Sequence, residues 1–146
     1  MKITYIDYGA KYLPKKKYAN DAGMDVYLND NIVILPHETI NIGLGFGLNV
    51  PIGYMFQLIE RSSIAARGLT AHISPIDPDY IGEIHLILTN LTNESIVLNE
   101  KERVAQLVMI PIVYFEITKE KIERRENNGL GSSGKWLYYK FAWKLL

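Results

Sequence analysis

The sequence contains no cysteine, which excludes disulfide bonds and metal sites built from thiolates and suits a reducing cytosol. It also lacks any apolar run near the roughly 20 residues of a membrane-spanning helix. Residues 1–21 have no continuous apolar stretch typical of a secretory signal peptide. Neither sign of charge is in excess, since 16 basic residues balance 16 acidic ones, so no overall field recruits nucleic acid or a membrane. We therefore expect a cytoplasmic protein, or one inside a host cell if a virus encodes it.

Strict alternation of apolar residues between Ile40 and Val50 is the strongest pattern in the chain. This period of two predicts a strand with one face in a core. Gly43, Gly45 and Gly47 fall on the opposite face, where a missing side chain lets another backbone, or a partner chain, approach closely. At 146 residues the chain is long enough for one domain with a core.

Further strands are predicted wherever short apolar runs lie between turn-forming residues, namely at Lys2–Tyr8, Met24–Leu28, Ile32–Leu35, Tyr54–Ile59, Glu83–Thr89, Ser95–Leu98 and Arg103–Ile112. Many short strands at this spacing are typical of a sandwich, barrel or jelly roll, so we expect an all-β fold. Ser62–Gly68 predicts one short helix with a serine cap and a terminating glycine. The charged stretch Glu116–Asn128 mixes acids with bases, which favours a solvated helix or an extended arm over a recognition helix.

The segment Ile76–Glu83 places an acid, an aromatic ring and a glycine within a few residues of each other. Such an order could hold a water molecule, stack on a base and offer backbone groups to its polar edge. Proline and aspartate also favour turns for purely local reasons, so the segment alone would also fit an ordinary acidic turn.

Four other segments carry polar residues that a β core does not need. The five together are Asp21–Val26, Arg61–Ala65, Ile76–Glu83, Glu102–Leu107, and Arg125 followed by Gly129–Gly134. In this order and spacing they resemble the five motifs of the trimeric dUTP diphosphatase (dUTPase) family. The resemblance runs from about Asp21 to Gly134, and five motifs in register make it specific.

The resemblance implies a jelly-roll-like β-barrel with one short helix and a C-terminal arm. It also implies hydrolysis of dUTP to dUMP and pyrophosphate, by in-line attack of water on the α-phosphorus. Asp77 would hold that water, with Asp25 orienting the charged site and Gln106 reaching a phosphate; these three are the expected catalytic residues. Tyr80 would stack on the deoxyribose and uracil and leave no room for a 2′-hydroxyl, while backbone groups between Ile76 and His85 would pair with the uracil edge.

The other expected substrate-binding residues follow from the same motifs. Together with Asp77, Tyr80 and Gln106 they are Arg61, Ser62, Ser63, Ser74, Ile76, His85, Arg103, Arg125, Leu130, Gly131, Ser132 and Ser133. The family further implies Mg²⁺ held mainly by substrate phosphates and water, with no dedicated protein ligands. It implies a homotrimer with shared sites, a β domain at residues 1–134 whose mobile arm spans about 125–134, and an aromatic extension at 135–146. We expect that extension to dock on its own or a neighbouring subunit.

Several positions depart from the family pattern. Glu60 stands where many members have proline, Ser74-Pro75 replaces a more usual Gly-Val, and Leu130 replaces a phenylalanine that covers the base. One alternative is a dCTP deaminase of the same fold, but that enzyme needs a glutamate where this chain has Ile87. A second alternative is a nucleotide-sensing regulator with weak catalysis.

Overall fold

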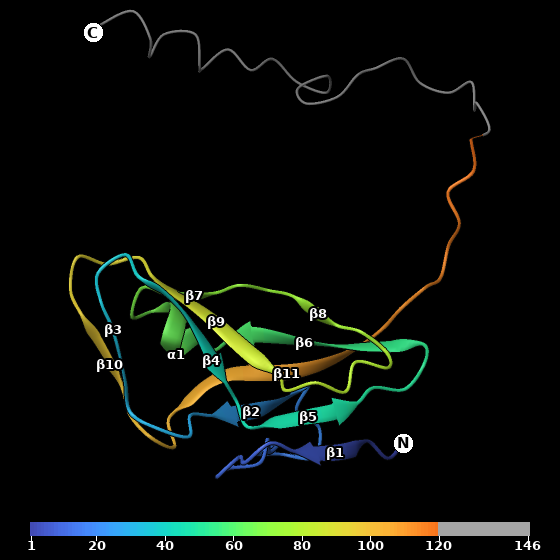
Figure 1. Ribbon diagram of the computed structural model, residues 1–146, viewed down its shortest axis with the longest axis horizontal. Helices are drawn as coiled ribbons and strands as arrows, with labels where there is room; N and C mark the ends of the chain where they lie inside the picture. The colour runs from blue at the N-terminus through green and yellow to red at the C-terminus, as the bar shows by residue number, and fades with distance from the viewer. Residues whose placement is uncertain (120–146) are drawn as a thin grey trace, which may run out of the picture. The chain divides into compact units, whose positions relative to one another are not determined.

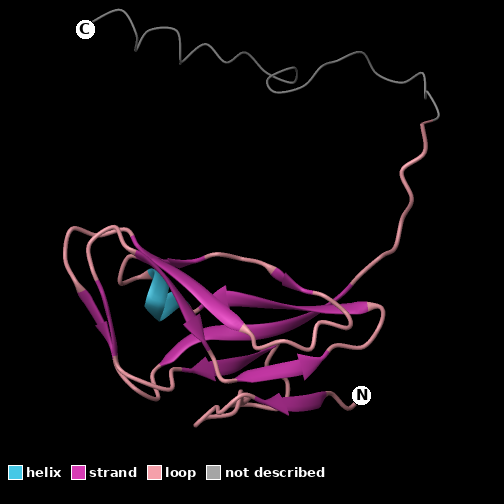
Figure 2. Ribbon diagram, in the orientation of Figure 1, coloured by secondary structure: helices cyan, strands magenta, loops and turns pink. Residues whose placement is uncertain are grey.

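Short strands and a single helical turn make up the computed structural model, which describes residues 1–119 (Figures 1 and 2). Residues 1–114 form one compact unit. Within the described residues the elements are β1 (Thr4–Asp7), β2 (Gly23–Tyr27), β3 (Ile32–Ile34), β4 (Thr39–Gly43), β5 (Phe46–Asn49), β6 (Tyr54–Glu60), α1 (Ser62–Ala65), β7 (Leu69–Ala71), β8 (Pro75–Ile76), β9 (His85–Asn90), β10 (Ile96–Leu98) and β11 (Arg103–Pro111).

All strand pairs in this part of the chain are antiparallel. The largest sheet has the order β2-β11-β6-β8, and a second sheet has the order β4-β9-β7. The remaining strands form two ribbons, β1 with β5 and β3 with β10. The expected all-β class is confirmed, but the described strands form separate sheets and no closed barrel. Among residues 1–119 no helix is long and apolar enough to cross a membrane.

The core is aliphatic and receives side chains from nearly every strand. The larger side chains that are less than 2% exposed are Val26, Leu28, Ile34, Leu44, Phe46, Ile64, Leu69, Ile84, Leu86, Leu88, Leu98 and Leu107. Two polar residues are buried among the described residues, Asp25 and Asn90. The Asn90 amide donates to the carbonyls of Ile34, Leu35 and Glu94, so its burial is compensated by hydrogen bonds that tie β9 to the end of β3.

The alternating segment Ile40–Val50 is two strands rather than one. The chain turns at Gly45, where φ is +73°, a backbone angle that glycine adopts without the steric cost of a Cβ. β4 then pairs with β9 while β5 pairs with β1, so the two halves join different sheets. The alternation correctly indicated which residues face the core. It could not reveal the turn at Gly45, because apolar and small residues keep alternating through that turn.

Three details differ from the sequence-based expectations. β7 and β8 were not predicted, since runs of two or three residues are too short for a periodic signal. The serine cap is wrong, because the N-cap of α1 is Arg61 in an extended conformation with no side-chain cap. Residues 116–119 have no regular structure, and the rest of the charged stretch lies outside the described residues.

Candidate active site

Asp25 on β2 is the centre of a charge network. Its carboxylate lies 3.1 Å from Arg61 Nε and 3.1 Å from Arg103 Nη1, while Gln106 Nε2 donates to it at 3.4 Å. Asp25 is only 6% exposed, and burying a lone carboxylate is costly unless charged partners compensate it. The carboxylate therefore holds two guanidinium groups and one amide in fixed positions.

Strand register explains why these residues meet. β11 lies between β2 and β6 in the largest sheet, and Gln106 is directly opposite Asp25 on β2. Ala105 is opposite Glu60, the last residue of β6, so Arg61 enters the same end of the sheet. Three segments far apart in the sequence thus deliver one polar cluster through backbone pairing.

The start of α1 lies next to this network. The amides of Ile64 and Ala65 both donate to the Arg61 carbonyl, so the Ser62 and Ser63 amides precede the first hydrogen-bonded turn. Both serines are exposed. Free amides and hydroxyls beside an arginine are suited to phosphate oxygens.

Open pockets flank the network. One of about 340 Å³ is lined by Lys17, Tyr18, Asp21, Ala22, Gly23, Asp25, Arg61, Arg103 and Gln106. A broader one of about 750 Å³ is lined by Tyr27, Arg61, Ser63, Arg67, Asn99, Glu100, Lys101, Glu102 and Arg103. Both contain Arg61 and Arg103, so the guanidinium groups that Asp25 holds form walls of the two pockets.

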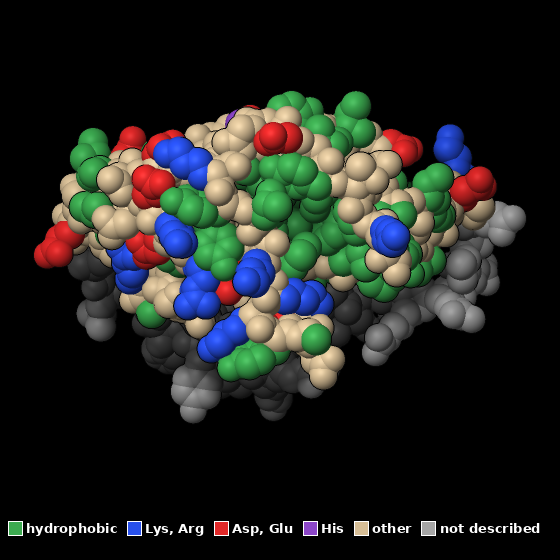
Figure 3. All heavy atoms as spheres, turned by 90° about the horizontal axis from the view of Figure 1, so that it is seen from below, with side chains coloured by type: hydrophobic (Ala, Val, Ile, Leu, Met, Phe, Trp, Pro, Cys, Tyr) green, Lys and Arg blue, Asp and Glu red, His purple; other side chains and the backbone are tan. Residues whose placement is uncertain are grey.

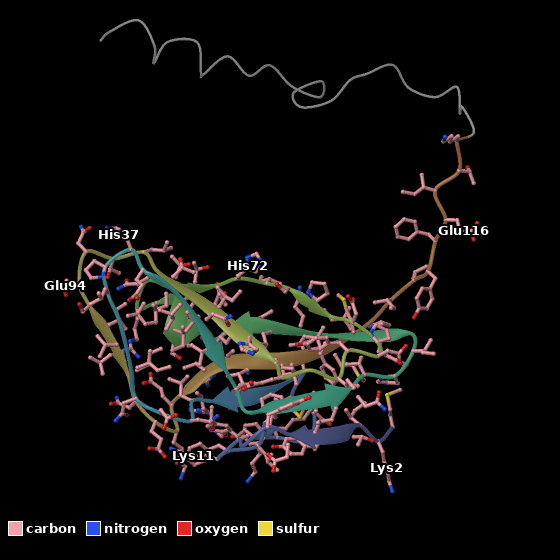
Figure 4. The ribbon with its side chains drawn as sticks, in the orientation of Figure 1. Lys2, Lys11, His37, His72, Glu94 and Glu116 are labelled. Atoms are coloured by element: carbon pink, nitrogen blue, oxygen red, sulfur yellow. The ribbon has the colours of Figure 1, made fainter. Side chains whose placement is uncertain are left out.

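A separate pocket of about 240 Å³ gathers residues of the acidic segment. It is lined by Leu58, His72, Ser74, Pro75, Ile76, Asp77, Tyr80, Glu83, Ile84, His85 and Ile87. An aromatic ring, a carboxylate and an apolar floor make it suitable for a nucleoside. Figure 4 shows His72 at the connection between β7 and β8, on one rim of this region.

A tight turn shapes the pocket's mouth. The Tyr80 amide donates to the Asp77 carbonyl, with Asp79 in the left-handed region at φ +65°. The Tyr80 hydroxyl then donates to the Glu83 carbonyl at 2.8 Å, and the Tyr8 hydroxyl donates to the Ile81 carbonyl at 2.8 Å. The ring of Tyr80 is thereby held at the edge of the pocket while remaining half exposed.

The segment 80–84 lies against the glycine face of β4 and β5. A Cβ on Gly47 would meet the Gly82 carbonyl oxygen at 2.6 Å, and one on Gly43 would meet the Glu83 carboxylate at 2.6 Å. The Glu83 carboxylate also accepts from the Gly45 amide at 2.7 Å. The close approach expected at these glycines therefore comes from the chain's own backbone and side chains, within residues 1–119.

The expected site residues separate into two groups. Arg61, Arg103 and Gln106 each contact Asp25, with Ser62 and Ser63 next to them. Ser74, Ile76, Asp77, Tyr80 and His85 line the other pocket, and the two groups share no pocket-lining residue. Arg125, Leu130, Gly131, Ser132, Ser133 and the extension 135–146 lie outside the described residues.

Sequence reasoning missed several pocket residues. Glu83 lay inside the acidic segment but was not selected, although its carboxylate lies against Gly43 and Gly45. His72 follows β7 and Leu58 lies on β6, and only tertiary folding brings them to the acidic turn. Lys17 and Tyr18, which line the pocket beside Asp25, were also missed, while Asp21 belonged to the first motif but was not selected as a site residue.

Glu60, which departs from the family pattern, and Arg67 and Ile87 each have a defined structural setting. The Glu60 carboxylate accepts the Ala71 amide at 3.0 Å, so it links β6 to β7. Arg67 pairs with Glu102 at 2.6 Å and is thus occupied outside the Asp25 network. Ile87 lines the nucleoside pocket, so its side chain presents no proton-transferring group there.

Residues 1–119 provide no cluster of side chains suited to a metal ion. In this part of the chain no three His, Asp or Glu side chains gather closely enough to hold a metal ion. A divalent cation that draws on phosphate and water oxygens needs only one or two carboxylates from the protein.

Comparison with known proteins relates this geometry to a family. A sequence profile of the dUTPase family matches residues 10–134. The chain belongs to the dUTPase family. Its relatives include the deoxyuridine 5′-triphosphate nucleotidohydrolase of Hydrogenobaculum sp., 34% identical over 129 residues, covering 84% of this chain and 90% of the relative. The enzyme of the same name from Bdellovibrio bacteriovorus is 38% identical over 131 residues, covering 84% and 88%.

Solved structures of dUTPases share the fold. The dUTPase of Staphylococcus bacteriophage 80alpha with dUpNHpp superimposes with a TM-score of 0.81 at 23% identity, covering 92% of this chain and 99% of that one. A dUTPase from phage phi11 of S. aureus, whose structure details the coordination of a structural Mg(II) ion, gives a TM-score of 0.77 at 21% identity, covering 86% and 99%. The fold is therefore the jelly-roll-like β fold of dUTPases.

Proposed function

We propose that this protein is a dUTP diphosphatase, which hydrolyses dUTP to dUMP and pyrophosphate with Mg²⁺. The observation that carries the proposal is membership of the dUTPase family over residues 10–134, with curated relatives named for this activity. The geometry is consistent with it, since one pocket suits a nucleoside and a cationic cluster suits a polyphosphate.

The nucleoside end of the substrate would lie in the pocket of Asp77 and Tyr80. The Tyr80 ring, fixed by its hydroxyl bond to the Glu83 carbonyl, would cover the sugar and base. Backbone groups of the segment between Ile76 and His85 would read the uracil edge. A mismatched polar group buried against that edge can be rejected by a factor of about 10⁴ or more.

The triphosphate would contact the network centred on Asp25. Arg61, Arg103 and the Ser62 and Ser63 groups would bind phosphate oxygens, with the Gln106 amide beside them. Mg²⁺ bound to the phosphates would neutralise charge on the polyphosphate. The Asp77 carboxylate would accept a hydrogen of the attacking water and orient its lone pair toward the α-phosphorus, worth roughly 10²–10⁴-fold in rate.

A complete site would need a second subunit. The nucleoside pocket and the pockets beside Asp25 share no lining residue within one chain, which supports a shared site in a homotrimer. In this proposal residues 1–134 form the dUTPase domain, the arm at about 125–134 closes over the substrate, and 135–146 is an added extension. The activity is placed in the cytoplasm, or in a host cell for a viral protein.

The direct test is pyrophosphate release from dUTP, with UTP, dCTP and dTTP as parallel substrates. We expect release from dUTP alone at an appreciable rate. Ammonia release from dCTP would instead establish a deaminase, which Ile87 in the pocket disfavours. Binding of dUTP without turnover by the wild-type protein would establish a sensor.

Asp77→Asn tests the water-holding role. We expect turnover to fall by roughly 10²–10⁴-fold while the Kd for dUTP stays within a few-fold, because the amide keeps the shape but is not a base. Asp79→Asn is the matched control, since Asp79 is equally acidic but does not line the pocket. An active Asp77→Asn variant would exclude Asp77 from this role.

Subunit sharing can be tested by complementation. Asp77→Asn and Gln106→Ala should each be impaired as homo-oligomers, yet about a quarter of the sites in randomly mixed trimers would contain both wild-type residues. We expect co-refolded mixtures to recover that share of activity. No recovery in mixed trimers, verified by mass, would argue for sites within one chain, and a monomer in light scattering would exclude the trimer.

A further inference from the structure

Three consecutive lysines, Lys15, Lys16 and Lys17, lie beside the Asp25 network. Lys15 and Asp25 form an antiparallel bridge, in which the Lys15 amide donates to the Asp25 carbonyl at 3.0 Å and the Asp25 amide donates back at 2.9 Å. The lysine segment is therefore bonded directly to the strand that carries Asp25. None of the family motifs identified in the sequence includes these lysines.

A pocket of about 240 Å³ connects the lysines to the network. It is lined by Lys15, Lys16, Lys17, Asp25, Tyr27 and Arg103. Lys17 also lines the neighbouring pocket that contains Arg61 and Gln106. Together the two pockets bring five cationic side chains and two carboxylates to one surface, in a chain with no net charge. Figure 3, seen from the side of β1, shows Lys and Arg side chains gathered on this face.

The lysine charges are not neutralised by neighbouring carboxylates. The ion pairs among residues 1–119 include none of the three lysines. Lys16 Nζ donates to the Asp21 carbonyl at 2.6 Å, which ties the loop together, and Lys17 Nζ lies 5.1 Å from the centre of the Tyr18 ring. In contrast, the Asp25 charge already has two guanidinium partners. The surface thus keeps an excess of positive charge for an anionic ligand.

We propose that Lys15 and Lys17 bind the terminal phosphates of the nucleotide, the pyrophosphate end that leaves. Lys15 and Lys17 line the same pocket beside Asp25, so both ammonium groups can reach one polyphosphate. A nucleoside monophosphate lacks the terminal phosphates that the lysines would bind, so the lysines favour triphosphate over monophosphate. This role deepens the proposed function and rests on it.

The test substitutes Lys15 and Lys17. Within residues 1–119, neither of their ammonium groups donates a hydrogen bond, whereas that of Lys16 does. Lys15→Gln/Lys17→Gln leaves the Lys16 tether and the backbone bridge to Asp25 intact. We expect the KM for dUTP and the Kd for inorganic tripolyphosphate with Mg²⁺ to rise about tenfold, as for two exposed charge contacts, with kcat within about twofold. The Kd for dUMP should not change.

Lys2→Gln/Lys11→Gln is the charge-matched control. Both side chains point outward (Figure 4), and neither lines the pockets beside Asp25. This control should retain tripolyphosphate affinity within about twofold, because neither ammonium group lines these pockets, Lys11 is already paired with Asp30, and exposed charges are screened by salt. Lys15→Arg/Lys17→Arg should restore binding. Single Lys17→Gln replaces the double variant if the double variant melts at a lower temperature.

The outcomes separate this proposal from the proposed function. Unchanged tripolyphosphate affinity in the lysine variant, or an equal loss in the charge-matched control, would overturn the role of the lysines. Failure of the wild type to hydrolyse dUTP would overturn the proposed function, and the titration with tripolyphosphate would still decide whether the lysines bind polyphosphate.

Discussion

Gly47→Ala is the sharpest test of how the glycine face positions the nucleoside pocket. Gly47 lies on β5, where the backbone is extended and would accept alanine without strain of its own. The obstacle is the neighbour, since the new Cβ would lie 2.6 Å from the Gly82 carbonyl oxygen and 3.1 Å from that of Ile81. Carbon–oxygen contacts in proteins are ordinarily about 3.3 Å or longer, so the loop must move by about 0.7 Å.

The loop cannot move freely, because it is bonded on both sides of the contact. The Ile84 amide donates to the Phe46 carbonyl at 2.8 Å, and the Leu44 amide donates to the Ile84 carbonyl at 3.0 Å. The Tyr8 hydroxyl holds the Ile81 carbonyl. Forcing a methyl group into such a contact costs about 1–3 kcal/mol of unfolding free energy.

The catalytic effect should exceed the effect on folding. Tyr80 is two residues from the displaced carbonyl, and misplacing a binding group by about 1 Å can cost about 100-fold in rate. We expect kcat/KM for dUTP to fall about 10- to 100-fold, with a lowered melting temperature. Steady-state pyrophosphate release and thermal unfolding measure the two quantities.

Gly53→Ala provides the control. Nothing lies within 4 Å of its added Cβ, but φ is +88°, so alanine there costs about 1–2 kcal/mol of stability through backbone strain alone. This variant should be destabilised yet keep its kcat/KM. A Gly47→Ala protein that is folded and fully active would refute the reasoning that links this contact to the pocket.

The other expected outcomes concern the charge network, the tyrosine ring and one surface pair. Asp25→Asn should lower the unfolding free energy by about 2–3 kcal/mol in denaturant titration, because Arg61 and Arg103 lose the carboxylate that they share. The two arginines are partly exposed, so solvent screens part of this loss. An unchanged denaturation midpoint would contradict this expectation. Tyr80→Ala should raise the KM for dUTP and lower the preference for dUTP over UTP, measured by comparing kcat/KM for the two nucleotides. The hydrogen bond from Tyr12 to the Glu100 carboxylate raises the pKa of the Tyr12 phenol, so that interaction stabilises the fold below the usual phenol pKa and is lost as pH rises through the raised value. Glu100→Gln should move this transition to lower pH in an ultraviolet titration of tyrosine, and no movement would contradict the assignment.

Much of the fold was predictable from local pattern. Alternating apolar residues identified most strands, because a strand with one buried face must place apolar side chains at every second residue. The short helix was also predicted, although its cap was misassigned. β7 and β8 were not predictable, since their residues become strands only by pairing with β9 and β6.

The candidate site divides in the same way. The sequence predicted which residues could bind phosphate or hold water, because that chemistry is a property of each side chain in the five motifs. The family resemblance implied a charge network around Asp25 and Arg103, but the direct pairing of Asp25 with both Arg61 and Arg103 depends on the register of three strands. The position of Lys15, Lys16 and Lys17 beside Asp25 could not be predicted for the same reason, since it depends on a backbone bridge between Lys15 and Asp25.

The sequence by itself determined the all-β class, the positions of most strands and the family to which the chain belongs. Its three alternate glycines also required some close approach to β4 and β5. Only the tertiary structure decided that the segment 80–84 makes this approach and that the chain turns at Gly45 into a second sheet. The physical reason is that a side chain's chemistry and a strand's periodicity are local, whereas the identity of a packing neighbour depends on how distant segments pair.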